Sequence, residues 1–113
     1  MSLIVDTSKP TQLLQAIKKQ IDDGKIQTWT YDKDGDFTHT PDQWSGQAWL
    51  RPKVQPAALT FGLIGPKDVV MSKLIYGVYH GRFIEMLLTH FDRDFTLAHA
   101  TASPTEYDQI KTK

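Results

Sequence analysis

The chain contains no cysteine among its 113 residues. Disulfide bonds, thiolate metal sites and thiol catalysis are therefore excluded, and the absence is typical of a reducing compartment. No apolar run approaches the roughly 20 residues that a membrane-spanning helix needs. The first ten residues also lack the basic region and long apolar stretch of a secretory signal. We expect a cytoplasmic protein that makes no contact with a membrane.

An excess of charge of either sign is also missing. Thirteen Lys and Arg residues balance thirteen Asp and Glu residues, which leaves a formal net charge of +0. The chain as a whole therefore has no electrostatic attraction for nucleic acid or anionic lipid. We expect nucleic acid not to be a partner, although the balance leaves room for a local basic patch.

Motifs of the common catalytic and cofactor sites are absent as well. The chain has no phosphate-binding loop, no Gly-x-Ser-x-Gly and no His-Glu-x-x-His. Its four histidines are scattered, and the spacing of His80 and His90 would not place them on one face of a helix. We predict neither a metal site nor a cofactor.

The composition of the chain is typical of one folded domain. Hydrophobic residues make up 40% of the chain and aromatic residues 11%, which favours a globular structure over disorder. A length of 113 residues suits one hydrophobic core and is too short for two. We therefore treat residues 1–113 as a single domain and expect residues 104–113 to form a frayed tail.

The first clear element is a helix predicted over residues 9–23. Ser8 is a suitable cap, Pro10 suits the first turn, and Gly24 suits the position just past the end. The apolar residues recur at spacings of three and four, as one buried helix face requires: Leu13, Leu14, Ile17 and Ile21.

The stretch Asp32 to Phe37, with the sequence DKDGDF, is similar to the start of a calcium-binding loop. A calcium loop of the EF-hand type needs a glycine at its sixth position and a glutamate at its twelfth, where this chain has Phe37 and Gln43. A type I turn followed by Gly35 in the left-handed conformation explains the same residues as a hairpin connection. We predict the hairpin and no calcium site.

That hairpin fixes which residues face one another. With residues 33–35 as the loop, Tyr31 lies opposite Phe37 and Trp29 lies opposite His39, so all four side chains share one face of the sheet. Two further strands are predicted at residues 48–54 and 58–64. Pro52 favours an edge or a bulge for the first of these, and the continuous apolar sequence of the second favours a central strand.

Residues 72–91 have two interpretations. A single helix places the apolar residues along one stripe but carries Gly77 and Gly81 in its interior, at about 1 kcal/mol each relative to alanine. The alternative is a strand over residues 73–80 followed by a helix over residues 82–91, with Gly81 at the junction. We favour the split, and we expect a last strand in residues 95–102.

The order of these elements predicts the fold class. Consecutive strands joined by short turns form an antiparallel sheet, and two amphipathic helices must cover one of its faces. We predict an α+β fold, a two-layer sandwich of a mostly antiparallel sheet with two helices packed on one face.

The aromatic sheet face is the first candidate site, and its residues are Trp29, Tyr31, His39, Trp49 and Arg51. Exposed aromatic residues with a flanking cation are typical of an interface, so we expect a binding or interaction module that forms a homodimer, binds a protein partner or takes a small-molecule ligand. The same aromatic residues on a sheet also occur in single-stranded nucleic-acid binders. The alternative is that the helices cover this face, which would leave Thr28, Thr30, Leu50 and Val54 pointing outward.

The second candidate site is an acid/base cluster of His80, Arg82 and Glu85 near the proposed strand-to-helix junction. Backbone donors at such a junction bind anions, so the cluster suits a small enzyme without a cofactor. The structural alternative is that Arg82 and Glu85 form a surface ion pair while His80 caps or packs. The sequence does not decide whether the protein is catalytic.

Overall fold

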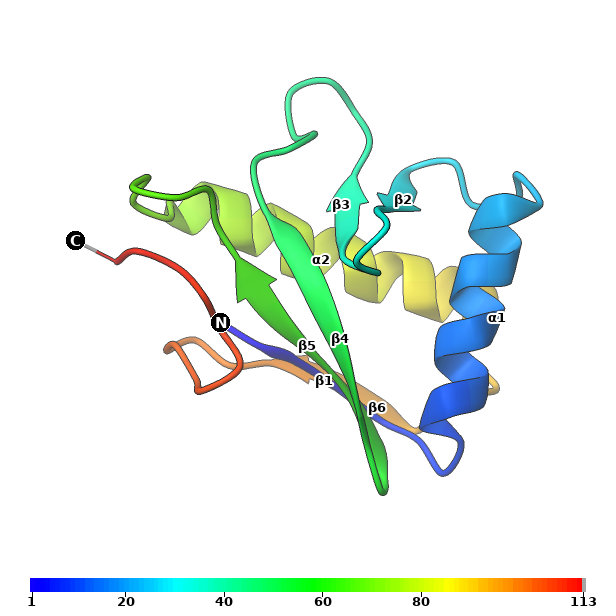
Figure 1. The fold of residues 1–113 in the computed structure, drawn as a ribbon. Coiled ribbons are helices and arrows are strands. Elements are labelled where there is room, and N and C mark those ends of the chain that lie inside the picture. The colour runs from blue at the N-terminus through cyan, green and yellow to red at the C-terminus, as the bar shows by residue number, and fades with distance from the viewer. Residues whose placement is uncertain (113) are drawn as a thin grey trace.

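The computed structural model describes residues 1–112, and these form an α+β two-layer sandwich (Figure 1). The sheet has six antiparallel strands in the order β2-β3-β4-β5-β1-β6, so the predicted fold class is confirmed. Within residues 1–112, neither helix combines the length and the apolar content required to span a membrane. The elements are β1 (Leu3–Asp6), α1 (Pro10–Asp22), β2 (Trp29–Tyr31), β3 (Phe37–His39), β4 (Trp49–Gln55), β5 (Ala58–Ile64), α2 (Lys73–Phe91) and β6 (Leu97–Ala100).

Helix α1 begins at Pro10, and Gly24 has a positive φ of 77° just past its end, as predicted. The N-terminal cap of the helix differs from the predicted cap, Ser8. The N-cap residue is Lys9, and no side chain makes a capping hydrogen bond. The hydroxyl of Thr7, and not that of Ser8, accepts a hydrogen bond from the Lys9 N–H at 3.1 Å.

The hairpin of β2 and β3 has the predicted register, with Trp29 opposite His39 and Tyr31 opposite Phe37. Gly35 has a φ of 83°, and its N–H donates to the carbonyl of Asp32 at 2.9 Å, which closes the predicted turn. The carboxylate of Asp32 also accepts from two backbone N–H groups of the loop, at 2.9 and 3.1 Å. This local network holds the connection between the two strands.

Helix α2 is one continuous helix, so the predicted split of residues 72–91 is wrong. Ser72 caps it, because its hydroxyl accepts from the N–H of Ile75 at 3.0 Å. The continuous helix buries a row of side chains against the sheet, each worth about 1.5–3 kcal/mol, which outweighs about 1 kcal/mol for each interior glycine. The buried residues are Tyr79, His80, Phe83, Met86, Leu87 and Phe91.

Strand β1 is the fifth strand in the order of the sheet. It is four residues long and lies between β5 and β6. The sequence analysis does not predict it. Leu3 pairs with Phe61 and Val5 with Leu59, so β1 extends the buried face of β5.

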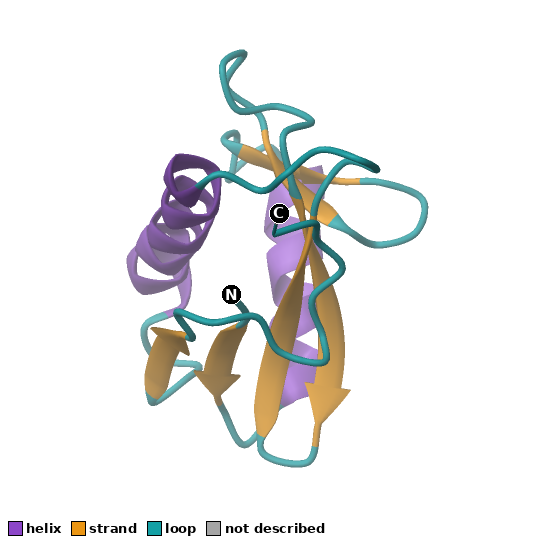
Figure 2. Cartoon of the chain, turned by 90° about the vertical axis from the view of Figure 1, so that its left-hand side faces the viewer, coloured by secondary structure: helices purple, strands orange, loops and turns teal. Residues whose placement is uncertain are grey.

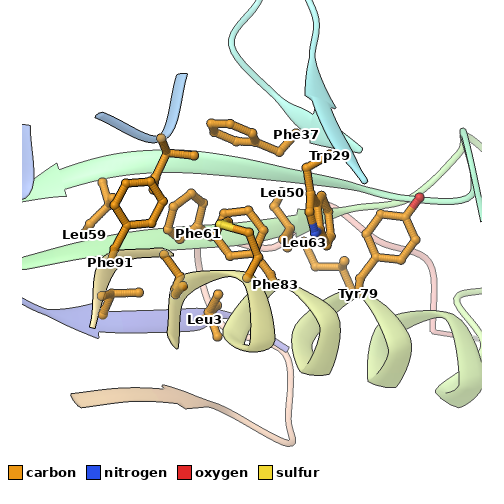
Figure 3. Close-up of a cluster of buried hydrophobic side chains, with 14 of the residues drawn as sticks. Leu3, Trp29, Phe37, Leu50, Leu59, Phe61, Leu63, Tyr79, Phe83 and Phe91 are labelled. Carbon is orange, nitrogen blue, oxygen red and sulfur yellow. The ribbon is translucent and has the colours of Figure 1, made fainter. Parts of the chain in front are cut away.

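Both helices pack on the same face of the sheet; the core lies between α2 and the strands (Figure 3), and α1 adds Leu13 and Ile17 to it. Phe83 of α2 is central, since its ring lies 4.9 Å from that of Trp29, 5.7 Å from that of Phe37 and 4.7 Å from that of Phe61. The alternative interpretation, that the helices cover the aromatic sheet face, is therefore correct for Trp29. Its second part is wrong for Leu50, which pairs with Phe37 and is fully buried on the same face, whereas Val54 is 44% exposed.

The chain after Pro104 differs from the prediction of a frayed tail. Backbone groups of Gln109 exchange hydrogen bonds with the carbonyl of Leu63 and the N–H of Gly65, at 2.8 and 3.0 Å. Further along, the N–H of Met71 donates to the carbonyl of Lys111 at 2.7 Å. In Figure 2, which colours helices, strands and loops differently, this segment is one of the long loops.

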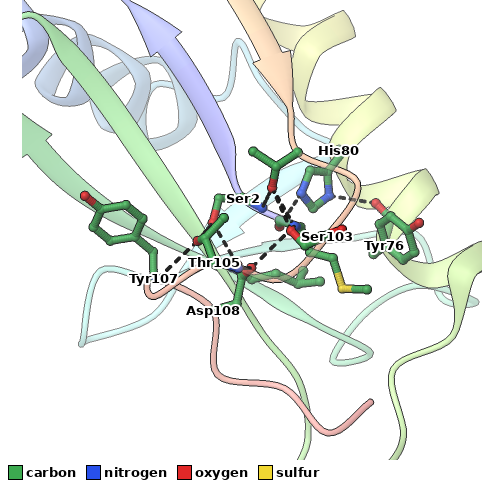
Figure 4. Close-up of polar contacts among 10 residues, drawn as sticks. Ser2, Tyr76, His80, Ser103, Thr105, Tyr107 and Asp108 are labelled. Atoms are coloured by element: carbon green, nitrogen blue, oxygen red, sulfur yellow. Dashed lines mark hydrogen bonds and ion pairs between the residues drawn. The ribbon is translucent and has the colours of Figure 1, made fainter. Parts of the chain in front are cut away.

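The side chain of Asp108 explains why this segment stays on the sheet. Its carboxylate is almost completely buried and accepts from the N–H of Leu63 at 2.8 Å and from the N–H of Thr105 at 2.7 Å. It also accepts from the hydroxyl of Ser2 at 2.9 Å (Figure 4). Charge-assisted hydrogen bonds of this kind are stronger than neutral ones, so one carboxylate joins three distant segments.

Candidate functional site

The structure does not bring the five residues of the aromatic sheet face to one surface. Trp29 and His39 lie in the core, with 1% and 4% of their surface exposed. Tyr31 is at its rim, where its hydroxyl donates to the Asp22 carboxylate at 2.8 Å. Trp49 is on the opposite side of the sheet, because the next residue along β4 faces the core.

Arg51 shares the outer side of the sheet with Trp49. Its guanidinium donates to both carboxylate oxygens of Asp36, at 3.0 and 2.8 Å. The Asp36 carboxylate raises the pKa of Arg51, because it stabilises the charged form. Arg51 therefore has an intramolecular partner at the turn of the β2–β3 hairpin.

The second candidate cluster is separated as well. His80 lies two positions before Arg82, which on a helix is a rotation of about 200°. The His80 ring is buried, with Nδ1 at 2.7 Å from the carbonyl oxygen of Tyr76 and Nε2 against the carbonyl of Met1 (Figure 4). Arg82 and Glu85 are exposed and form an ion pair at 3.3 Å. His80 is thus a packed residue that has no contact with this pair.

Arg82 and Glu85 line a different feature, an open cleft of about 600 Å³ that we call the His39 cleft. One wall is the second half of α2, and the other is formed by residues 25–28 and 41–44, which flank β2 and β3. His39 lies between these walls. The sequence analysis predicts the helix of this wall, residues 82–91, but misses the cleft, because the packing of that helix beside the hairpin joins segments that are far apart in the chain.

The ring of His39 is held in one orientation. Its Nδ1 lies 2.6 Å from the carbonyl oxygen of Thr28, and its face lies 4.5 Å from the indole of Trp29. Because a carbonyl oxygen only accepts, we assign the hydrogen to Nδ1. No protein group within residues 1–112 hydrogen-bonds Nε2, and this atom keeps access to solvent. In the neutral ring of His39, Nε2 is therefore the unprotonated nitrogen, and it is available to a molecule bound in the cleft.

Burial lowers the pKa of His39, because the charged imidazolium loses hydration. The hydrogen bond to the Thr28 carbonyl acts in the opposite direction. The charge of Arg82 lowers the pKa further and that of Glu85 raises it. The balance favours the neutral ring at neutral pH, so Nε2 is a hydrogen-bond acceptor there.

The charged side chains of the cleft are mainly cationic. Lys25 and Arg82 face a single carboxylate, that of Glu85. In the part of the chain that the structure describes, Lys25 has no ion-pair partner. The same residues contain no group of three or more His, Cys, Asp or Glu side chains arranged to hold a metal ion.

No protein-family model, no curated protein and no solved structure matches this chain. The geometry and chemistry of the His39 cleft are therefore the basis on which a function can be assigned.

Proposed function

We propose that the protein is a non-catalytic binding module that holds a small organic anion in the His39 cleft. The observation that carries this proposal is the cleft itself. Its volume of about 600 Å³ falls in the range of roughly 300–1,000 Å³ that is typical of small-molecule sites. It is lined from separate parts of the chain, mainly by polar and charged residues, and its apolar lining residues are Ile26, Pro41, Trp44 and Met86.

The charges of the cleft support an anionic ligand. The ion pair of Arg82 and Glu85 is long, at 3.3 Å, and 57% and 63% of the two side chains are exposed. Ion pairs this exposed contribute little, so the guanidinium is free to bind a carboxylate or phosphate with its remaining N–H groups. Lys25 adds a second cation on the opposite wall.

The cleft replaces the aromatic sheet face as the proposed binding surface. Trp29 and His39 contribute to the core, and Arg51 is paired with Asp36, so that face offers a partner or a second copy of the chain no continuous aromatic surface. The aromatic side chain that the cleft offers besides His39 is Trp44, which is half-buried on the loop side of the cleft. Its indole provides an apolar surface for the organic part of a ligand.

Titration of ¹⁵N-labelled protein with benzoate and phenyl phosphate tests this proposal, with benzyl alcohol as the neutral control. We expect both anions to shift the amide signals of Thr28, Trp44 and Thr89, which line the cleft, at millimolar concentration or below. Benzyl alcohol should bind more weakly, and Arg82→Gln should weaken both anions. Shifts confined to other surfaces, or equal binding of the neutral control, would contradict the proposal.

A second candidate function, ester hydrolysis in the same cleft, is favoured by the free Nε2 of His39. In this reaction Nε2 removes a proton from water while the water oxygen bonds to the acyl carbon. The carbon–oxygen bond to the alcohol then breaks, and the leaving oxygen takes the proton back from the imidazolium. Arg82 would stabilise the negative charge on the carbonyl oxygen in between.

Hydrolysis of p-nitrophenyl acetate tests this second candidate. We expect His39→Phe to lose most of the rate above background, and His99→Phe to retain it, since His99 lies on the exposed strand β6. Equal losses in both variants would mean that the ester reacts with exposed side chains in general, and would remove the enzymatic candidate.

A further inference from the structure

The acceptor nitrogen of His39, Nε2, requires a hydrogen-bond donor. His39 is 4% exposed, and its Nε2 has no partner among the groups of residues 1–112 but keeps access to solvent, since the buried side-chain nitrogen without a partner there is Nε1 of Trp29. A polar atom that loses water without gaining a hydrogen bond is unfavourable. Since His39 lines the cleft, a ligand that displaces water from Nε2 has to supply a donor in its place.

We propose that the ligand of the His39 cleft is an organic anion that also carries a hydroxyl or amide N–H, which donates a hydrogen bond to Nε2 of His39. This inference rests on the proposed function and narrows it to one ligand class. The anionic group lies toward Lys25 and Arg82, and the donor group lies against the imidazole.

The surroundings of the ring make this acceptor a selective one. The Thr28 carbonyl fixes the tautomer, and the rings of Trp29 and Tyr79 lie 4.5 and 6.2 Å from that of His39. The ring therefore has little freedom to turn and offer a donor instead. A site with a fixed acceptor disfavours ligands that cover it without a matching donor, because the acceptor then loses water and is left unpaired.

Matched ligands distinguish the contribution of the donor group to binding from that of the anionic group. The 3- and 4-hydroxybenzoates carry both groups, the corresponding methoxybenzoates replace the donor by an acceptor, and benzoate has neither. For the better hydroxy isomer, calorimetry of the wild type should give a dissociation constant roughly tenfold below those of benzoate and its methoxy counterpart. The ¹⁵N signal of Nε2 should move on binding of the hydroxy compound alone.

His39→Phe is the variant of choice, because it keeps a ring against Trp29 and removes the acceptor. The Thr28 carbonyl does not become an orphan in this variant, since it also accepts from the N–H of Thr40 at 2.9 Å. We expect the preference for the hydroxy compound to shrink to about twofold or less, since the acceptor that it requires is gone. Arg82→Gln should weaken all of these anions alike, and Arg93→Gln, outside the cleft, should weaken none.

The outcomes distinguish the inference from the proposed function. Equal binding of hydroxy, methoxy and unsubstituted anions, with an unmoved Nε2 signal, would mean that water is the donor and would overturn the inference alone. No binding of any of these anions at millimolar concentration would overturn both. A preference that survives in His39→Phe would assign the donor to a different acceptor and would also overturn the inference.

Discussion

The main-chain carbonyl of Tyr107 occupies the space in which a side chain on Gly62 would begin. A Cβ atom placed on Gly62 would lie 2.8 Å from the carbonyl carbon of Tyr107 and closer still to its oxygen. The contact is between backbone atoms, which cannot turn away as the end of a flexible side chain can. The glycine in the middle of β5 thus allows the C-terminal segment to cross the sheet.

Gly62→Ala is therefore expected to destabilise the protein by about 1–3 kcal/mol, the usual effect of forcing atoms into a packed region. Urea unfolding measures the loss, and amide exchange should show that Gln109 loses protection, because it bonds to Leu63 next to the contact. An unchanged midpoint together with an unchanged exchange rate would show that the segment does not depend on this glycine.

Gly77 and Gly81 of α2 provide the opposite case. Neither would bring an added Cβ atom within 4 Å of another group, and both lie in a regular helix. We expect Gly77→Ala and Gly81→Ala each to stabilise the protein by about 0.5–1 kcal/mol, because alanine restricts the unfolded chain. A loss of stability in the same urea experiment would mean that the two glycines are needed for a contact that is not seen in the isolated chain.

Leu87 and Leu88 are neighbours on α2 with opposite environments. Leu87 is fully buried, whereas 55% of Leu88 is exposed. Leu87→Ala should lower the free energy of unfolding by about 2–5 kcal/mol through lost burial and a cavity, and Leu88→Ala should change it by about 0.5 kcal/mol or less. Similar losses from both variants would mean that the outer side of α2 is also covered in solution.

The stability of the protein should fall as the pH is lowered from 7.5 to 5. Burial lowers the pKa of His80, although its hydrogen bonds to the carbonyls of Met1 and Tyr76 act against this shift. Below about pH 6.5 the unfolded chain takes up a proton on this residue more readily than the folded chain does. The contribution to stability is therefore complete above that pH and is lost as the pH falls.

Unfolding curves across this pH range measure the effect. His80→Gln should reduce the dependence and leave the part that comes from His39, whose pKa is also lowered by burial. His99→Gln on the exposed strand β6 should leave the dependence as in the wild type. An equal slope in the wild type and His80→Gln would assign the pH dependence to other groups.

Local features of the sequence predict the hairpin and the first helix because their determinants are adjacent in the chain. Gly35 and the Asp32 carboxylate close the turn, and Pro10 and Gly24 bound α1. Helix α2 is harder, because the intrinsic cost of Gly77 and of its β-branched and aromatic neighbours is a local property, whereas its compensation comes from packing on strands far away in sequence.

The His39 cleft could not be predicted for the same reason. The analysis correctly places His39 opposite Trp29, but which side of the sheet the helices cover is decided by β4. A single pairing, of Phe37 with Leu50, turns Trp49 and Arg51 away from the hairpin's aromatic residues. The register between β3 and β4 depends on a loop of nine residues, 40–48, whose sequence specifies no particular turn.

The position of β1 has a consequence for the order of events during synthesis. This strand leaves the ribosome early, yet both of its neighbours, β5 and β6, are made from residues 58–64 and 97–100. Its apolar residues Leu3 and Val5 therefore have no strand partner until β5 and β6 have been translated. Pairings this distant in sequence close large loops and slow folding. The nascent chain must complete its sheet after β6 has emerged, in a late step that joins segments far apart in the sequence.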